Sequence, residues 1–297
     1  MKLDPFIEAE EVAGRSVKHC CDMFEVSRAA YYQRQKQIPS ARDVSDGELV
    51  EKIREVHDDS DGTYGSPRVH KELLARGVAC GRRRVRRLMV ADGLEGRCKK
   101  RWRTTTIQDP AAQAEALDLI QRHFGPCEIL DARYVGDITY IATWEGWAYL
   151  ATVIDLASRR VVGWALADHM RTELISNALL MAFGQRRPPA GAIFHSDRGC
   201  QYTSRDFRQL AQDHGIVLSL GRKGTCWDNA VAESFFASIK RELIDRRPWP
   251  TIAGLHRAVF DWVEGWYNTL RLHSSLGYLS PAQYEARIHQ NLSSQAA

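Results

Sequence analysis

Residues 135–141 form the run Val135-Gly136-Asp137-Ile138-Thr139-Tyr140-Ile141, in which β-branched and aromatic residues flank one carboxylate. This composition predicts a β-strand with Asp137 at its centre. A second acid, Asp197, follows a short apolar run, at a point where a strand should end in a loop. A third acid, Glu233, lies in the segment 228–236, which is predicted to be a helix. The three acids therefore belong to three different elements.

The elements around these acids follow an alternating α/β order. Three strands in rapid succession are expected to pair antiparallel, and helices alternate with strands after them. The predicted strands are 134–143, 147–156, 160–167, 192–195 and 217–220, and the predicted helices are 172–186, 204–214 and 228–243. In this order one acid is mid-strand, one ends a neighbouring strand and one lies on a helix that crosses the sheet. Carboxylates far apart in sequence can therefore converge.

Convergence of Asp137, Asp197 and Glu233 would create a metal site. Phosphodiester chemistry needs charge neutralised at the attacking and the leaving oxygen, and two divalent cations about 3.5–4 Å apart do this. Magnesium prefers oxygen ligands and keeps several of its waters, so three acids leave room for phosphate oxygens. The alternative is chance, because the chain has 37 acidic residues and many trios would fit some spacing.

The sequence blocks that flank the acids carry a family resemblance. They lie at 136–141, 146–151, 154–156, 162–164, 195–202, 227–230, 233–236, 266–268 and 273–278. In this order they resemble the insertion-sequence transposases of the IS3 family, specifically the second-reading-frame product that carries the integrase-type core. The order Asp, Asp, Glu, with 35 residues between the last two, is also similar to that of DDE transposases and retroviral integrases.

This resemblance implies a fold, a reaction and a cofactor. The fold is an α/β, ribonuclease-H-like mixed-sheet core preceded by an all-α helix-turn-helix region. The enzyme is a DDE transposase, a polynucleotidyl transferase that cleaves DNA at insertion-element ends and transfers the exposed 3′ hydroxyl to another phosphodiester. The three acids would hold two Mg²⁺ ions, which Mn²⁺ can replace, and no protein nucleophile is required. A copy-out route is implied as well, although the acids alone would serve other routes.

Other polar residues near the acids each have two interpretations. Lys240 lies nearly two helical turns after Glu233 and therefore on the same helix face. The resemblance implies that Lys240 contacts the terminal DNA of the element, and the alternative is an ordinary surface lysine. His195 and Asn229 are candidates to orient the metal ligands through hydrogen bonds, or equally to cap a strand end and a helix. Asp155, in an otherwise apolar strand, is expected to be structural or to lie outside the ligand set.

A strongly basic segment precedes the predicted core. Residues 64–103 contain 13 Lys or Arg residues and three acids, although the net charge of the chain is only +4. A helix at 66–75, a Gly-containing turn and a second helix from near Gly81 predict a helix-turn-helix. The residues expected to face inward are Val69, Leu73, Leu74, Val85, Leu88 and Met89.

The second of these helices carries the expected DNA contacts. They are Arg82, Arg83, Arg84, Arg86 and Arg87. Arginines at this density supply phosphate-dominated affinity for DNA, and the alternatives are a solvated face or a localisation signal. Further upstream, helices over 17–24 and from Ser27, a candidate N-cap, predict either another helix-turn-helix or a plain helical hairpin.

Five regions are expected along the chain. They are a small helical segment (1–37), a basic helix-turn-helix domain (38–104), a linker with a connecting helix (105–126), the catalytic core (127–245) and a carboxy-terminal helical extension (246–297). In the extension, Trp262 and Trp266 are at helical spacing and are expected to pack in a core rather than stack on bases. Arg271 and His273 are expected either to touch DNA or to fix the extension to the core.

Composition and short motifs limit the class of protein and its expected location. The chain of 297 residues is 44% hydrophobic and 26% charged, as expected for a globular protein of about two domains. It has no apolar run near the roughly 18 residues of a membrane helix and no secretory signal, so a cytoplasmic location is expected, on the bacterial nucleoid when DNA is bound. The seven cysteines lack the paired spacing of zinc sites and are expected to be free thiols. The sequence contains no glycine-rich phosphate loop, so a built-in ATPase is not expected.

The expected partner is double-stranded DNA, as element ends and as target. The resemblance implies a homo-multimer on DNA and an upstream reading frame that supplies another helix-turn-helix and a zipper. Two other classes of function stay open: a DNA-binding regulator that has lost activity, and a ribonuclease or junction nuclease on the same fold. The intact acids argue against the regulator. The large basic module and the order of the acids argue against the nuclease.

Overall fold

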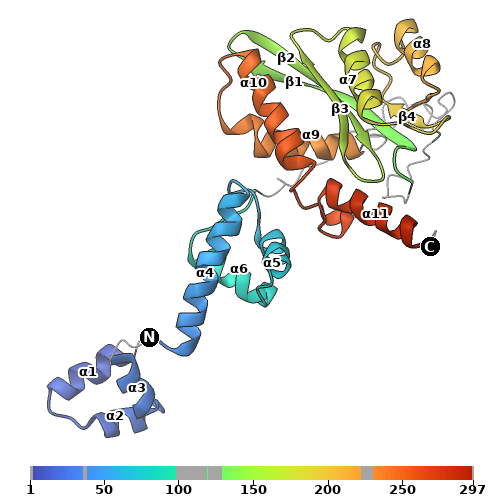
Figure 1. Cartoon of the computed structure of the whole chain (residues 1–297). Coiled ribbons are helices and arrows are strands. Elements are labelled where there is room, and N and C mark those ends of the chain that lie inside the picture. The colour runs from blue at the N-terminus through green and yellow to red at the C-terminus, as the bar shows by residue number, and fades with distance from the viewer. Residues whose placement is uncertain (1–2, 36–38, 98–118, 120–128, 222–229, 296–297) are drawn as a thin grey trace, which may run out of the picture.

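The computed structural model describes residues 3–35, 39–97, 119, 129–221 and 230–295. Its amino-terminal half is helical, with α1 (Asp4–Val12), α2 (Val17–Met23), α3 (Arg28–Gln35), α4 (Ala41–Asp59), α5 (Ser66–Ala75) and α6 (Arg82–Ala91). The predicted connecting helix within 105–126 lies outside the described residues, apart from Leu119. Figure 1 shows these helices as a group apart from the sheet.

A five-stranded mixed sheet forms the centre of the second half. Its strands are β1 (Arg133–Thr143), β2 (Gly146–Asp155), β3 (Val161–Ala167), β4 (Ile193–Ser196) and β5 (Val217–Leu220). The order across the sheet is β3-β2-β1-β4-β5, with β1, β2 and β3 antiparallel and with β4 and β5 parallel to β1. The predicted strands are confirmed to within one residue at each end. This topology is the ribonuclease-H-like, integrase-type fold that the resemblance implied.

Helices cover both faces of this sheet. The helices and short helical segments of this half are α7 (Thr172–Gln185), α8 (Arg205–Asp213), α9 (Ala230–Glu242), η3 (Ile244–Arg246), α10 (Ile252–Phe260), η4 (Asp261–Tyr267), η5 (Ser274–Leu276) and α11 (Pro281–Gln295). Apolar residues of α7 and α8 pack with Tyr134 and Phe194 on one face. Those of α9, α10 and η4 pack with Val135 and Ile141 on the other. Because successive strand residues face opposite sides, β1 contributes to both layers.

Two glycines allow close packing around β1 and β3. A Cβ on Gly136 would lie 2.2 Å from the ring of Phe194 on β4, and a Cβ on Gly163 would lie 2.1 Å from the carbonyl oxygen of Ala178 on α7. Only a residue without a side chain permits these approaches. Gly136 therefore lets the Phe194 ring cover β1 immediately before Asp137.

The helix-turn-helix region is a three-helix unit with its own core. Helix α4 begins with a capping box in which Ser40 and Asp43 bond each other's backbone N–H, a favourable start for a helix. The predicted inward residues Val69, Leu73, Val85, Leu88 and Met89 are buried in one cluster. The expectation for Leu74 is wrong, because its side chain is 43% exposed. One residue is a turn of about 100° around a helix, and this rotates Leu74 away from the face that holds Leu73.

The first three helices form a smaller cluster. Ile7, Val17, Cys21 and Tyr31 are buried together, and α2 and α3 lie where helices were predicted. The backbone N–H of Ala30 lies 3.5 Å from Ser27 Oγ, a long capping contact. The four cysteines in the described part of the chain are free thiols; Cys98, Cys127 and Cys226 lie outside it.

The carboxy-terminal extension contains a π-helical segment that separates its two tryptophans. In η4 the backbone bonds span five residues, as in Asn268 N–H to the Val263 oxygen. Trp262 is buried in the sheet-side core, as predicted. Trp266 is only partly buried and contacts both that core and the cluster of α4–α6, with its ring 5.6 Å from the ring of Tyr64. The extra residue per turn shifts Trp266 toward the amino-terminal helices.

The extension also joins the helix-turn-helix unit to the core. Tyr64 donates to the carbonyl oxygen of Leu270 at 3.4 Å and accepts from Leu272 N–H at 2.8 Å. Arg68 Nε donates to the carbonyl oxygen of Leu272 at 3.0 Å, and the Leu272 side chain is buried among the α4–α6 residues. The alternative that Arg271 fixes the extension is correct, since Arg271 is buried and bonded to Glu242 on α9.

Among the described residues, no helix is both long enough and apolar enough to cross a membrane.

Candidate active site

The first acid occupies the predicted position in β1. Asp137 is partly buried, and its Oδ1 accepts the N–H of Ile138 at 2.8 Å. The pKa of Asp137 is raised to about 7, chiefly by burial and also by the negative charges of Asp197 and Glu233, while the bond from Ile138 and the charge of Lys240 lower it. Asp197, Glu233 and Lys240 therefore all lie within electrostatic range of Asp137.

The second acid reaches this position through the parallel pairing of β4 with β1. Val135 is opposite His195 in the last pair of these strands, and Asp137 and Asp197 each follow that pair by two residues. Asp197 is exposed, and its Oδ1 accepts the N–H of Gly199 at 2.9 Å. Arg198 Nε donates to the carbonyl oxygen of Gly221 at 3.1 Å. The loop after β4 is therefore held in a defined conformation.

The third acid lies in the first turn of α9. Glu233 is exposed on the helix, and partial burial raises its pKa. Lys240 follows on the same helix and places its Nζ 5.5 Å from the centre of the Tyr140 ring on β1. Its charge also lowers the pKa of Asp137. Lys240 thus lies on the side of α9 that faces β1.

The three carboxylates suit a hard divalent cation, but they are not grouped closely enough in this structure to hold one. The charges of Asp197 and Glu233 raise the pKa of Asp137, so negative charge is concentrated around Asp137, and a cation would neutralise it. Carboxylate oxygens are the ligands that magnesium prefers. Among the described residues, no three His, Cys, Asp or Glu side chains are grouped closely enough to hold an ion.

Tyr202 is a neighbour of the acids that residue patterns did not single out as a site residue. It is buried against Phe194 and Phe207. Burial, followed by the charges of Asp137 and Asp197, raises the pKa of Tyr202 well above its ordinary value. Its position in the 195–202 block was the available signal. Because a tyrosine in a loop is common, only the fold reveals its proximity to both acids.

Of the two residues predicted to orient the metal ligands, the structure describes only His195. His195 is buried in β4, with Nδ1 2.9 Å from Ser219 Oγ on β5; its role toward Asp197 stays a prediction. Asn229 lies outside the described residues. Asp155 has a structural role, because its carboxylate accepts the N–H groups of Asp131 and Ser158 and the Ser158 hydroxyl at the β2–β3 turn.

The five arginines of α6 are not equivalent. Arg84 Nε donates to Asp46 at 2.6 Å, and Arg87 Nη2 donates to the other oxygen of the same carboxylate at 2.5 Å. The other three arginines are exposed: Arg82, Arg83 and Arg86. Sequence reasoning could not detect the pairing, since Asp46 lies 38 residues before Arg84, on α4.

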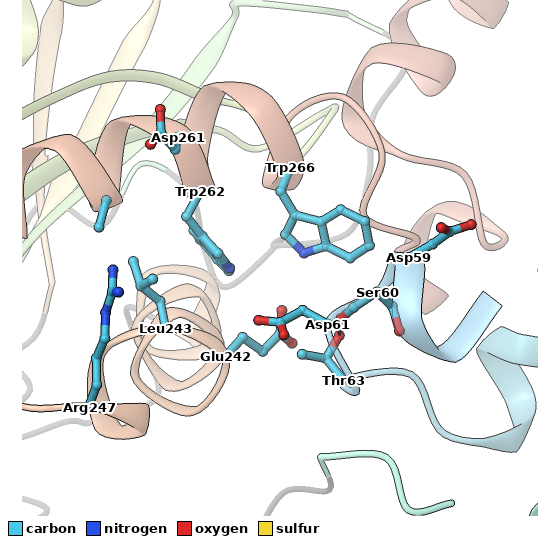
Figure 2. A pocket seen from close by; sticks show the side chains of 11 residues that line it. Asp59, Ser60, Asp61, Thr63, Glu242, Leu243, Arg247, Asp261, Trp262 and Trp266 are labelled. Carbon is cyan, nitrogen blue, oxygen red and sulfur yellow. Dashed lines mark hydrogen bonds between the residues drawn. The ribbon is translucent and has the colours of Figure 1, made fainter. Parts of the chain in front are cut away.

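A pocket of about 320 Å³ lies elsewhere, where the loop after α4 approaches α9 and η4. Figure 2 shows Asp61 and Glu242 from these separate segments below the rings of Trp262 and Trp266. None of Asp137, Asp197 and Glu233 lines it. The chemistry of the three acids therefore belongs to the surface near β1, β4 and α9 and not to this pocket.

Comparisons with known proteins agree with this arrangement. Two models of the integrase core domain match residues 130–226 and 214–281, and a model of an HTH-like domain matches residues 45–102. The chain is 35% identical over 286 residues to the transposase InsF of insertion sequence IS3A from Escherichia coli, covering 94% of this chain and 97% of that protein. The chain belongs to the IS3 family of insertion-sequence transposases.

Other members of the IS3 family are similarly close. A putative transposase of element IS986/IS6110 from Mycobacterium tuberculosis is 38% identical over 270 residues, covering 89% of this chain and 96% of that protein. The IS629 transposase of Shigella sonnei is 35% identical and covers 92% of both chains. Among solved structures, the catalytic core domain of HTLV-2 integrase in complex with magnesium aligns with 52% of this chain and 97% of its own, at 18% identity and a TM-score of 0.40. The match to the integrase core models and the identity to these transposases show that the chain is an integrase-core transposase, a DDE polynucleotidyl transferase.

Proposed function

We propose that Asp137, Asp197 and Glu233 hold the catalytic cations of this transposase, and that Lys240 contacts the DNA end. The observation that carries this proposal is the convergence of three charged groups on Asp137: Asp197 and Glu233 raise the pKa of Asp137, and Lys240 lowers it. Groups on β1, on the loop after β4 and on α9 are brought together only by the fold. A cationic side chain beside three carboxylates favours a substrate with phosphate groups.

Each residue has a distinct role in this scheme. Two bound Mg²⁺ ions would activate the attacking oxygen and neutralise the leaving oxygen of the phosphodiester. Asp137, fixed in β1, and Asp197, in the bonded loop after β4, provide the rigid side of the site. Glu233 approaches from α9. Cleavage at an element end exposes a 3′ hydroxyl, and the same residues serve its transfer to a second phosphodiester.

The test is cleavage and joining of a labelled duplex that carries the cognate element ends. Activity is expected with Mg²⁺ and with Mn²⁺, and none with EDTA. Because the proposed ligands are carboxylates, activity should increase with metal concentration until the site is saturated. The chain is assayed alone and fused to the product of the upstream reading frame. Cleavage that persists in EDTA, or inactivity of both forms with Mg²⁺, would contradict the proposal.

We propose that α6 binds the phosphates of duplex DNA chiefly through Arg82, Arg83 and Arg86. Arg84 and Arg87 contribute less, because Asp46 already neutralises part of their charge. Substitution of these three arginines by alanine should weaken binding and reduce the slope of log affinity against log salt by up to about 2.7, at about 0.9 per phosphate. The double variant Arg84→Ala/Arg87→Ala is the matched control, with a smaller change in slope. Fluorescence anisotropy over a salt series measures both, and equal slopes for all proteins would disprove the assignment.

The active assembly is proposed to contain several copies of this chain on DNA. Two element ends must be held together during strand transfer. One candidate site can bind only one scissile phosphate at a time, so several copies of the chain are needed. The upstream reading frame would add a second helix-turn-helix and a zipper to each copy. Sedimentation with and without paired DNA ends tests this expectation, since a complex that contains only one copy per two ends would contradict it.

A further inference from the structure

Three large aromatic side chains are exposed on the β1–β2 hairpin. Tyr140 is 62% exposed, Trp147 is 53% exposed and Trp144, at the tip, is 74% exposed. The hairpin lies in the catalytic core, and its inner residues Ile141 and Ala148 are buried as the sheet requires. Exposed tryptophan at this density has no role in packing the described core. Exposed apolar groups that are gathered together indicate a binding surface.

The rings of Tyr140 and Trp147 form one unit. Tyr140 lies opposite Tyr149, and Ala142 lies opposite Trp147, so Tyr140 and Trp147 are diagonal neighbours on one face of the hairpin. Their ring centres are 5.2 Å apart, with the planes at 83°. In this edge-to-face contact Tyr140 supports the Trp147 ring, and half of the Trp147 surface stays open to solvent.

The hairpin that carries these rings is anchored at its tip. Trp144 N–H donates to the carbonyl oxygen of Trp249 at 3.0 Å. Glu145 Oε2 accepts the N–H of Ile252 at 2.7 Å, at the start of α10. Thr143 Oγ1 donates to the carbonyl oxygen of Gly146 at 2.7 Å within the turn. A ring on such a support loses little freedom when a ligand stacks on it.

The same unit is connected to the candidate active site. Tyr140 follows Asp137 by three residues in β1, about 10 Å at the rise of a strand. Lys240 places its Nζ over the Tyr140 ring, 5.5 Å from the ring centre, and its charge reaches Asp137. The pairing of β1 with β4 ends at Val135, so β4 does not cover the part of β1 that carries Tyr140. Tyr140 and Asp137 are an odd number of residues apart, so their side chains point to opposite faces of β1, and Lys240 of α9 lies within range of both.

We infer that Trp147 and Tyr140 form a stacking platform for a base of the DNA end, unpaired from its duplex near the scissile phosphate, with Lys240 holding a flanking phosphate. This inference deepens the proposed function and rests on it for the position of the scissile phosphate. An aromatic face with an adjacent cation is the combination that binds a nucleotide, because base stacking and phosphate attraction act together. The charge of Lys240 favours DNA over a second copy of this face, in which two lysines would meet.

Fluorescence of 2-aminopurine tests the platform independently of catalysis. The probe is placed at successive positions of a duplex end and bound to Asp137→Asn protein, so that no cleavage occurs. At one position close to the scissile phosphate, fluorescence should change on binding, since the base leaves the duplex and stacks on Trp147. The change should be lost with Trp147→Ala and largely retained with Trp147→Phe. Phe260→Ala, which removes another exposed ring on α10, should leave it unaltered.

Cleavage rates supply the second measurement. Trp147→Ala should lower cleavage of an intact end by about 5- to 150-fold, the change that corresponds to about 1–3 kcal/mol of stacking per base. An abasic site at the position found with 2-aminopurine should lower the wild-type rate by a similar factor and should not lower the variant further. The platform would be overturned if the effects of Trp147→Ala and of the abasic site on the cleavage rate multiplied, or if Trp147→Ala cleaved at the wild-type rate. It would also be overturned if Trp147→Ala changed only the number of copies of the chain that associate in solution. If Asp137→Asn still cleaves, the proposed function fails, and the fluorescence measurement still decides on the platform.

Discussion

Asp137→Asn should abolish both cleavage and joining while leaving DNA binding intact. Asn keeps the shape of the side chain but removes the negative charge with which β1 would hold a cation. Metal ions supply several kcal/mol of charge stabilisation in such reactions, and each 1.36 kcal/mol is a factor of ten. The rate is therefore expected to fall by about three orders of magnitude or more. Asp197→Asn and Glu233→Gln should have the same effect, because the three carboxylates act as one site.

The matched control is Asp206→Asn, which neutralises an exposed carboxylate on α8 in the same domain. It should retain wild-type activity. Rates are measured on labelled element ends with Mg²⁺, and affinity is measured by anisotropy on the same DNA. Wild-type cleavage by any of the three variants would remove that residue from the site. Loss of DNA binding in parallel with activity would show that the residue acts through folding or affinity.

Asp137→Asn should also stabilise the metal-free protein. The pKa of Asp137 is raised from 3.8 to about 7, so the folded state binds this proton more tightly than the unfolded state. The stability linked to it is complete below the unfolded pKa, falls as the pH rises and is lost above pH 7. Neutral Asn avoids this cost, so Asp137→Asn should raise the free energy of unfolding at pH 8, by at most about 4 kcal/mol at about 1.4 kcal/mol per pKa unit. Denaturant unfolding in EDTA should show a smaller gain at pH 5, and a loss of stability at pH 8 would contradict the assigned burial.

Breaking the buried pair of Arg271 and Glu242 should destabilise the protein more than any surface substitution. The side chains are 4% and 2% exposed, and two bonds of 2.8 and 2.7 Å join the guanidinium to the carboxylate. Removal of one partner leaves an unpaired charge in the interior, which costs about 3–5 kcal/mol. Arg271→Met and Glu242→Leu are each expected to lower the free energy of unfolding by this amount.

The double variant separates this cost from a general packing defect. With both charges replaced by apolar side chains, no charge is left unpaired, and stability should return toward that of the wild type. Denaturant unfolding of the four proteins measures the coupling. Arg271 also lies between Leu270 and Leu272, which bond to Tyr64 and Arg68. The single variants should therefore increase proteolysis between the helix-turn-helix unit and the core, and additive losses in the double variant would refute the pairing as their cause.

Local sequence was sufficient for most of the element order. The strands at 133–143, 146–155 and 161–167 agree with the predicted ones because β-branched and aromatic residues, which favour strands, are concentrated in these segments. Helices α7, α8 and α9 agree because their apolar residues recur at helical spacing. The π-helical segment η4 could not be predicted in this way, since its bonds depend on what Trp262 and Trp266 pack against.

The candidate site, too, was only partly predictable from the sequence. The acids, their order and Lys240 on the face of Glu233 were readable from residue types and spacing, and the metal chemistry came from the family resemblance. The proximity of Tyr202 to two acids was not readable, nor was the joint surface of Tyr140 and Trp147. Both depend on strand pairing across the sheet. A strand pattern gives the face of a residue but not its cross-strand neighbour.

By itself, the sequence determined the class of elements, the basic character of the amino-terminal helices and the carboxylates available for catalysis, because these depend on residues close together in the chain. Only the tertiary structure decided which charges meet. Arg84 and Arg87 pair with Asp46, Arg271 is buried against Glu242, and Asp137 lies in the field of Asp197, Glu233 and Lys240. The energy of a charge depends on its distance to other charges and on its burial, and both are set by segments far apart in sequence that folding brings together.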